Sequence, residues 1–252
     1  VHKTPFSRIK SLNADLTEAD ARAKGYIKGT AKVEEVFNIL KRTTNPTTVY
    51  KKQKIDRDDQ IDITDFDVVA WLKSEMRMML DEELARAYLF GDGRLASSDD
   101  KINEDHIRPI AKDSDLFTVK KELTFDASAT DDDKAKAIIR AIIKSRKDYR
   151  GSGNPKLFIG EDLLSDMLLL EDTIGHALYE TEASLATKLR VSSIVTVPDE
   201  IIPNGIYCMY VNLNDYNVGA DKGGAISMFE DFDIDYNQQK YLIETRCSGA
   251  LI

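Results

Sequence analysis

The stretch DFDVVAWLKSEMRMMLDEELARAYL, residues 65–89, decides the fold because it is the longest strongly helical run in the chain. Its apolar side chains recur at steps of three and four residues, which places them on one face of a helix. They are Leu72, Met76, Met79, Leu80, Leu84 and Ala87. Gly91 follows and supplies the left-handed residue that ends a helix. About 23 helical residues at roughly 1.5 Å each predict a rod of roughly 34 Å, against which the rest of the chain packs.

The composition is that of a soluble globular protein with enough residues for a sizeable core. The chain has 252 residues, of which 42% are hydrophobic and 31% charged, and this length allows one large domain or two small ones. No run of 18 apolar residues occurs, so we expect no membrane-spanning helix and no membrane partner. Cys208 and Cys247 lie in apolar runs and are expected to be reduced packing residues.

Charge is distributed unevenly along the chain. Residues 1–60 hold 13 Lys and Arg against 8 Asp and Glu, a net charge of +5, and since the whole chain carries −9 the remainder carries −14. A basic arm on an acidic body has three interpretations: it binds nucleic acid, it lies on the acidic surface of a neighbouring copy, or it is a solvated face. Residues 3–42 are too polar to fold without a partner surface, which favours the neighbouring copy.

Shorter helices and several strands complete an α+β chain. A second helix is expected over 131–149, with a capping box from Thr130 to Asp133. The Gly-rich segment 151–155 is the best internal boundary, and a βαβ-like unit follows it. Further predicted elements are strands at 47–55, 156–159, 191–197, 207–212, 226–236 and 241–252, helices at 161–170 and 181–189, and a loop at 215–224. The alternation in 226–236 predicts a half-buried strand.

No motif in the chain indicates catalysis, a cofactor or a metal. A nucleophile elbow, H-E-x-x-H, C-x-x-C and the Gly-rich nucleotide loops are all absent. His2, His106 and His176 each stand alone, and isolated histidines are more often surface residues than ligands or bases. The acidic triplet 131–133 is explained by a helix start, and the aspartates in 231–235 lack the residues that would complete a ligand set. We therefore expect no enzyme.

Three stretches together resemble the major capsid proteins of tailed bacteriophages, a fold shared with encapsulins. They are EMRMMLDEELARAYLFGDGR (75–94), DTIGHALYE (172–180) with LRVSSIVTVP (189–198), and VNLNDYNVGADKGGAISMFEDFDIDYNQQKYLIETRCSGALI (211–252). The resemblance implies an α+β capsid fold with a long spine helix at 65–89. It divides the chain into an N-terminal arm and extended loop (1–45), a peripheral domain (46–152), an axial domain (153–224) and return strands of the peripheral domain (225–252).

The function that the resemblance implies is that of a structural shell subunit. Copies would form pentamers and hexamers of an icosahedral head that encloses phage or prophage double-stranded DNA without sequence specificity. Scaffold, portal and decoration proteins are further partners, and the expected location is the virion capsid, assembled in the bacterial host cytoplasm. Many members lose an N-terminal scaffolding segment on maturation, and a chain without one corresponds to a cleaved or truncated form.

Two alternatives to the DNA-filled head stay open. An encapsulin-like compartment would use the same fold to enclose protein cargo. A basic-arm nucleic-acid-binding protein is disfavoured by the acidic body, because such proteins concentrate positive charge on one face.

The resemblance also implies a candidate covalent cross-link. Some capsids of this family join a Lys of the extended loop to an Asn of the peripheral domain through an isopeptide bond, assisted by a Glu. Matching the last strand on its Glu-x-Arg assigns the Asn to Asn237 and the Glu to Glu244, with Lys24 or Lys28 as the donor. A non-catalytic interpretation also stands, because Asn is common in turns and Glu244 could pair with a basic neighbour on the strand.

Overall fold

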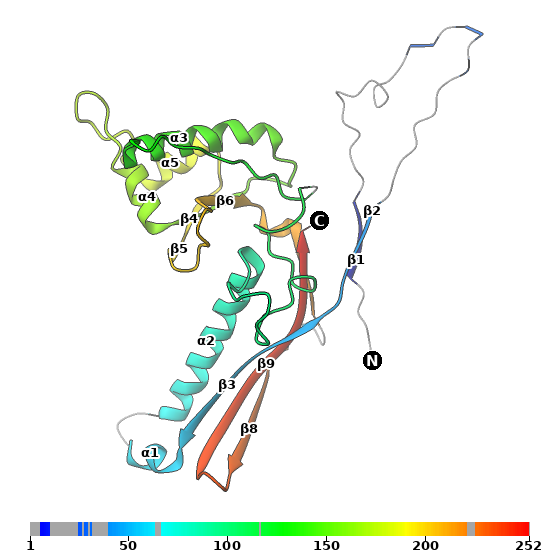
Figure 1. The fold of residues 1–252 in the computed structure, drawn as a ribbon, viewed down its shortest axis with the longest axis vertical. Coiled ribbons are helices and arrows are strands. Elements are labelled where there is room, and N and C mark those ends of the chain that lie inside the picture. Colours follow the sequence, from blue (N-terminus) through cyan, green and yellow to red (C-terminus); the bar gives the residue numbers. More distant parts are fainter. Residues whose placement is uncertain are drawn as a thin grey trace.

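The computed structural model describes residues 6–10, 25–26, 28–29, 31, 40–63, 67–115, 117–220 and 225–251. Its helices are α1 (Arg57–Asp62), α2 (Val68–Leu89), α3 (Asp131–Ser145), α4 (Glu161–Leu168) and α5 (Glu182–Leu189), with short 3-10 helices η1 (Arg146–Asp148) and η2 (Leu213–Asp215). Its strands are β1 (Phe6–Lys10), β2 (Leu40–Thr44), β3 (Thr47–Asp56), β4 (Lys156–Gly160), β5 (Ile194–Val197), β6 (Cys208–Val211), β7 (Tyr216–Ala220), β8 (Ser227–Asp233) and β9 (Gln238–Leu251). The molecule is an α+β protein, as the sequence predicts (Figure 1).

The expected long helix is α2, and its buried face is the predicted one. Asp67 caps its first turn by accepting a hydrogen bond from the Ala70 amide at 2.9 Å, and Gly91 ends it with φ +92°. Met76, Leu80 and Ala87 are buried, and Leu72 and Leu84 pack partly buried against the same cluster. Because residues 64–66 lie outside the described part of the chain, the helix is followed from Val68 onward.

Strand β9 is the centre of a four-stranded antiparallel sheet against which α2 lies (Figure 1). Residues 238–247 of β9 pair with β3, residues 238–244 also pair with β8, and residues 247–251 pair with β7. Tyr241, Ile243 and Cys247 point into the cluster beneath α2, while Glu244 and Arg246 point the other way. We call α2 with this sheet the α2 module.

Two sequence expectations in this sheet are wrong. The segment expected as a loop at 215–224 contains β7, because Tyr216 and Val218 pair with the end of β9 and Tyr216 joins the buried cluster there. The strand expected to be half-buried, β8, is exposed along most of its length and ends at Asp233. Ile234 and Tyr236 lie beyond it in the hairpin turn and are exposed. The alternation of polar and apolar residues in this stretch therefore does not correspond to a buried face.

Residues 131–211 form a second unit, the α3 module. Its three-stranded sheet has the order β5-β4-β6, with β4 parallel to β5 and antiparallel to β6. The predicted capping box is present, since Thr130 and Asp133 hydrogen-bond to each other's backbone amides. The core between helices and sheet includes Ile138, Leu157 and Leu185. A smaller cluster, containing Phe90, Phe158 and Leu251, joins this module to the end of α2 and of β9.

The arm extends from the body on a two-stranded ribbon. β1 pairs antiparallel with β2, in register from Phe6 opposite Thr44 to Lys10 opposite Leu40. The described residues 25–26, 28–29 and 31 lie at the far end, away from both modules (Figure 1). β2 continues directly through Asn45 and Pro46 into β3, which connects the arm to the sheet of the α2 module.

Candidate functional site

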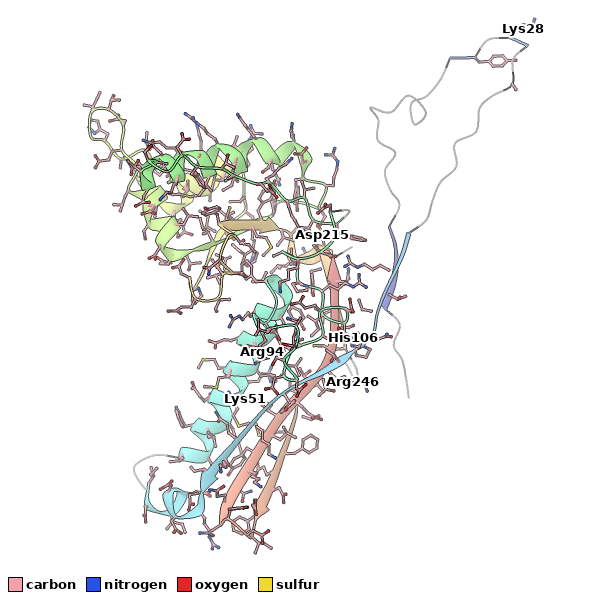
Figure 2. The ribbon with its side chains drawn as sticks, in the orientation of Figure 1. Lys28, Lys51, Arg94, His106, Asp215 and Arg246 are labelled. Atoms are coloured by element: carbon pink, nitrogen blue, oxygen red, sulfur yellow. The ribbon has the colours of Figure 1, made fainter. Side chains whose placement is uncertain are left out.

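Asn237 and Lys28 lie on the surface at opposite extremes of the molecule. Asn237 occupies the turn between β8 and β9 with φ 52°, the left-handed region that Asn tolerates better than most residues. The Asn237 side-chain amide donates to Asp58 at 3.4 Å, and the Asn237 backbone carbonyl accepts from the Arg57 backbone amide at 3.1 Å. Lys28 is exposed at the far end of the arm (Figure 2). Lys24 lies outside the described residues.

Glu244 does not meet Asn237 within one subunit. It lies partly buried in the middle of β9, opposite Tyr50 of β3 and Ser227 of β8. Seven residues of extended strand separate it from Asn237, a span of roughly 23 Å. A cross-link that uses both side chains would therefore need them from different subunits.

A buried ion pair holds the base of the arm on the body. Arg42 donates from Nη2 to both carboxylate oxygens of Asp113 at 2.7 Å, and from Nη1 to the Leu251 carbonyl at 3.0 Å. Its guanidinium stacks 4.0 Å from the centroid of the Phe117 ring. The Arg42 and Asp113 side chains are 9% and 5% exposed, and a bidentate pair this dry is among the stronger polar contacts in proteins. The sequence gives no sign of this pairing, because 71 residues separate the partners.

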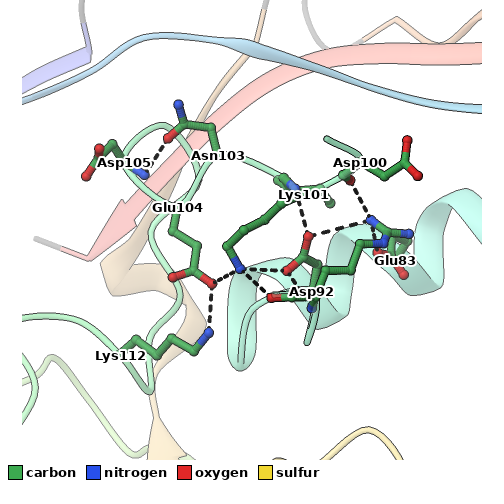
Figure 3. A network of polar contacts seen from close by, with 10 residues as sticks. Glu83, Asp92, Asp100, Lys101, Asn103, Glu104, Asp105 and Lys112 are labelled. Atoms are coloured by element: carbon green, nitrogen blue, oxygen red, sulfur yellow. Dashed lines mark hydrogen bonds and ion pairs between the residues drawn. The ribbon is translucent and has the colours of Figure 1, made fainter. Parts of the chain in front are cut away.

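A second polar network closes the segment that follows α2 (Figure 3). The fully buried Asp92 carboxylate accepts from the Ile102 amide at 2.7 Å and from Lys101 Nζ at 3.2 Å. Lys101 also reaches Glu104 at 3.0 Å, and Glu104 pairs with Lys112 at 2.7 Å. The segment Gly91–Gly93, interpreted from sequence as a helix stop, is thus also the anchor of the loop to residue 112.

The two acids of this network have lowered pKa values. Burial by itself raises the pKa of Asp92, but hydrogen bonds from Ile102, Lys101 and the Arg94 amide outweigh it. Burial also raises the pKa of Glu104, but the hydrogen bonds and positive charges of Lys112 and Lys101 lower it by more, so that the pKa ends below its ordinary value. Both groups are therefore held as carboxylates in the folded protein.

We expect Asp92→Asn to lower the free energy of unfolding at pH 7 by about 1–3 kcal/mol, since a charged acceptor of buried hydrogen bonds is lost. Because the folded pKa values lie below the ordinary 3.8 of Asp and 4.5 of Glu, the stabilisation is complete at neutral pH and is lost as the pH falls below these values. Urea unfolding of both proteins at pH 7 and pH 3 tests this. If the difference in free energy of unfolding between the two proteins were as large at pH 3 as at pH 7, the Asp92 carboxylate would not be the source of the stabilisation.

Large apolar side chains are exposed at many places in the described chain, including two turns at its surface. Ile61, Ile234 and Tyr236 are exposed at the end formed by α1 and the β8–β9 turn. Leu169 and Ile174 are exposed in and beside the loop that leaves α4 in the α3 module. Single exposed apolar side chains are normal on a protein surface, so these residues by themselves identify no contact.

The described residues hold no group of three or more His, Cys, Asp and Glu side chains arranged to bind a metal. That includes the aspartates of 231–235, of which Asp233 pairs with Lys240. Cys208 and Cys247 are both free thiols. In the part of the chain that the structure describes, no helix is both long and apolar enough to cross a membrane.

Comparison of the whole structure with solved structures identifies the fold. The capsid of a native GTA (gene transfer agent) particle matches with a TM-score of 0.62 and 14% identity, covering 100% of this chain and 82% of that chain. A structure from Mycobacterium phage Ogopogo matches with a TM-score of 0.65 and 12% identity, covering 100% of this chain and 85% of that chain. A structure from Mycobacterium phage Bobi matches with a TM-score of 0.64 and 13% identity, covering 100% of this chain and 79% of that chain. No protein-family model and no curated protein sequence matches the chain.

These matches confirm the fold that the sequence resemblance implies. The chain has the fold of the tailed-phage major capsid proteins over its whole length, with α2 as the spine helix. At 10–14% identity the likeness lies in backbone arrangement.

Proposed function

We propose that this chain is a major capsid subunit, which assembles with copies of itself into pentamers and hexamers of a closed icosahedral shell around double-stranded DNA. The observation that supports it most is the match of the entire chain to capsid structures, arm included. The proposed role is structural and non-enzymatic. The proposed location is the virion capsid, assembled in the bacterial cytoplasm, and scaffold, portal and decoration proteins are proposed as further partners.

The arrangement of charge and apolar surface supports assembly. The described part of the arm projects from the body on the β1–β2 ribbon, and a two-stranded ribbon is marginally stable until it packs on a further surface such as another subunit. The arm, residues 1–45, is basic, whereas the chain as a whole carries −9. In this proposal the arm lies on the peripheral domain of a neighbour. We extend the axial domain from 153–224 back to α3, because α3 shares one core with β4 and α5, and this domain lies around five-fold and six-fold axes.

The contents of the particles separate the proposal from its nearest alternative. Particles from expressing cells should be treated with nuclease, opened, and analysed for protected nucleic acid and for additional protein. Protected double-stranded DNA of uniform length supports a head. Shells that hold one additional protein and no DNA would instead identify a compartment for protein cargo.

The proposed position of the arm leads to a prediction about salt and proteolysis. Residues 3–42 should be cleaved rapidly in free subunits and protected in shells, and assembly should weaken as salt screens the contact between basic arm and acidic neighbour. Limited proteolysis with mass spectrometry, at two ionic strengths, measures both. Equal protection of the arm in free subunits and in shells would overturn its placement.

The cross-link is the most specific part of the proposal. The Lys28 or Lys24 ammonium would lose a proton to Glu244 of another subunit, and the amine would attack the Asn237 side-chain carbon. A new amide bond would form as ammonia leaves. Denaturing gel electrophoresis of mature shells should then show a ladder above the monomer, and Asn237→Asp should abolish it. A single monomer band from wild-type shells would exclude the bond.

A further inference from the structure

A groove opens on one side of the α3 module. Its volume is about 320 Å³, and it lies between the beginnings of α3 and α4 and the segment 199–207. The partly exposed Ile202 and Ile206 contribute apolar surface to it, with the buried Ile138 beneath them. The groove therefore offers apolar contact area that the chain itself leaves open.

Three carboxylates line this groove without an ion-pair partner. They belong to Asp162, Asp166 and Asp199, and no Lys or Arg of the described residues forms an ion pair with them. Asp199 accepts a hydrogen bond from the Asp162 amide at 3.3 Å, which fixes it at the start of α4. Lys134, which also lines the groove, is paired with Asp131 at 2.8 Å. The groove is thus lined by apolar side chains together with an excess of negative charge.

The other side of α3 carries a basic ridge made of Arg140, Lys144 and Lys147. All three side chains are exposed, and within the described chain none of them forms an ion pair. At 3.6 residues per turn, Arg140 and Lys144 lie roughly 160° and 120° around the helix axis from Ile138, which faces the groove. One helix therefore has an acidic groove on one side and unpaired cations on the other.

We infer that the groove of one subunit receives the basic ridge of the next copy, a contact that rests on the proposed function. The alkyl stems of Arg140 and Lys144 would cover Ile202 and Ile206, while their charged ends meet Asp162 and Asp166. Because ridge and groove are different patches, each subunit uses one patch toward each neighbour, and a contact of this kind forms a ring when its rotation closes, as five-fold and six-fold symmetry requires. DNA on the ridge would leave the groove carboxylates unpaired, which favours the second copy as the occupant.

Charge reversal on each side, and on both together, tests the pairing. Arg140→Glu with Lys144→Glu, and separately Asp162→Lys with Asp166→Lys, should each lower the yield of rings and shells at least about tenfold, since like charges then face each other. The chain with all four substitutions should recover most of the wild-type yield. Lys188→Glu, an exposed cation on α5 of the same module, is the control and should assemble normally. Sedimentation and electron microscopy measure assembly, and thermal unfolding of the subunits verifies folding.

Each other outcome overturns the inference in a recognisable way. If the chain with all four substitutions gave no higher yield of rings and shells than the two double variants, the patches would not pair. Normal shells with reduced DNA content from the ridge variant would assign the ridge to nucleic acid. Wild-type yields from all variants would remove this contact while leaving the proposed function standing. A wild-type chain that forms no rings would remove the proposed function itself.

Discussion

Arg42→Ala is expected to lower the free energy of unfolding by about 3–5 kcal/mol, because it leaves the Asp113 carboxylate buried without a partner. The pair is nearly dry, and the Leu251 carbonyl and the Phe117 ring lose their contacts with the guanidinium as well. Urea unfolding of the dissociated subunit measures the effect. Arg42→Lys should lose part of this stability, since one ammonium cannot bind Asp113, donate to the Leu251 carbonyl and stack on the Phe117 ring at the same time.

Two controls separate the buried pair from charge removal in general. Arg77 and Asp81 form an ion pair on α2 whose side chains are 54% and 52% exposed, so Arg77→Ala should change stability by less than about 1 kcal/mol. Replacing Arg42 and Asp113 together by apolar residues should cost less than Arg42→Ala alone, because no charge is left unpaired. If Arg42→Ala and Arg77→Ala proved equally mild, the arm would not be anchored by this pair.

Met76→Ala should cost about 2–5 kcal/mol, the range for truncating a fully buried side chain. Met76 has no exposed surface and lies in the cluster between α2 and the β3–β9 sheet. Met78 is on the same helix and 49% exposed, so Met78→Ala is a matched control with an expected change within about 0.5 kcal/mol. Leu84→Ala, at a partly buried position, should fall between the two. Equal effects at Met76 and Met78 would mean that α2 presents a different face.

Local signals in the sequence are sufficient for α2, α3, α4 and α5, whereas the short helix α1 is not predicted by them. The 3.6-residue period of α2, the Thr130–Asp133 capping box and Gly91 all act over a few residues, and each is found where the pattern placed it. The loop expected in place of β7 and the half-buried strand expected in place of β8 are wrong, because the pairing and burial of a strand depend on its partners. Tyr216 and Val218 are strand residues only because the distant end of β9 pairs with them.

The polar contacts depend even more on residues that are distant in the sequence. Arg42 and Asp113, and Asp92 and Ile102, meet only after the chain has folded, so no local pattern marks them. The cross-link candidates came from resemblance, and the structure adds that Asn237 and Glu244 stand apart along β9 in one subunit. The groove and ridge of the α3 module likewise become visible only when α3, α4 and the segment 199–207 are placed together.

Electron cryomicroscopy of the purified assembly tests the central claim most directly. We expect closed icosahedral shells whose walls are rings of five and six subunits, with the arm of each subunit resting on a neighbour and the α3 modules surrounding the ring axes. Monomers, or particles without a closed shell, obtained from full-length chain under conditions in which the subunit is folded, would contradict it.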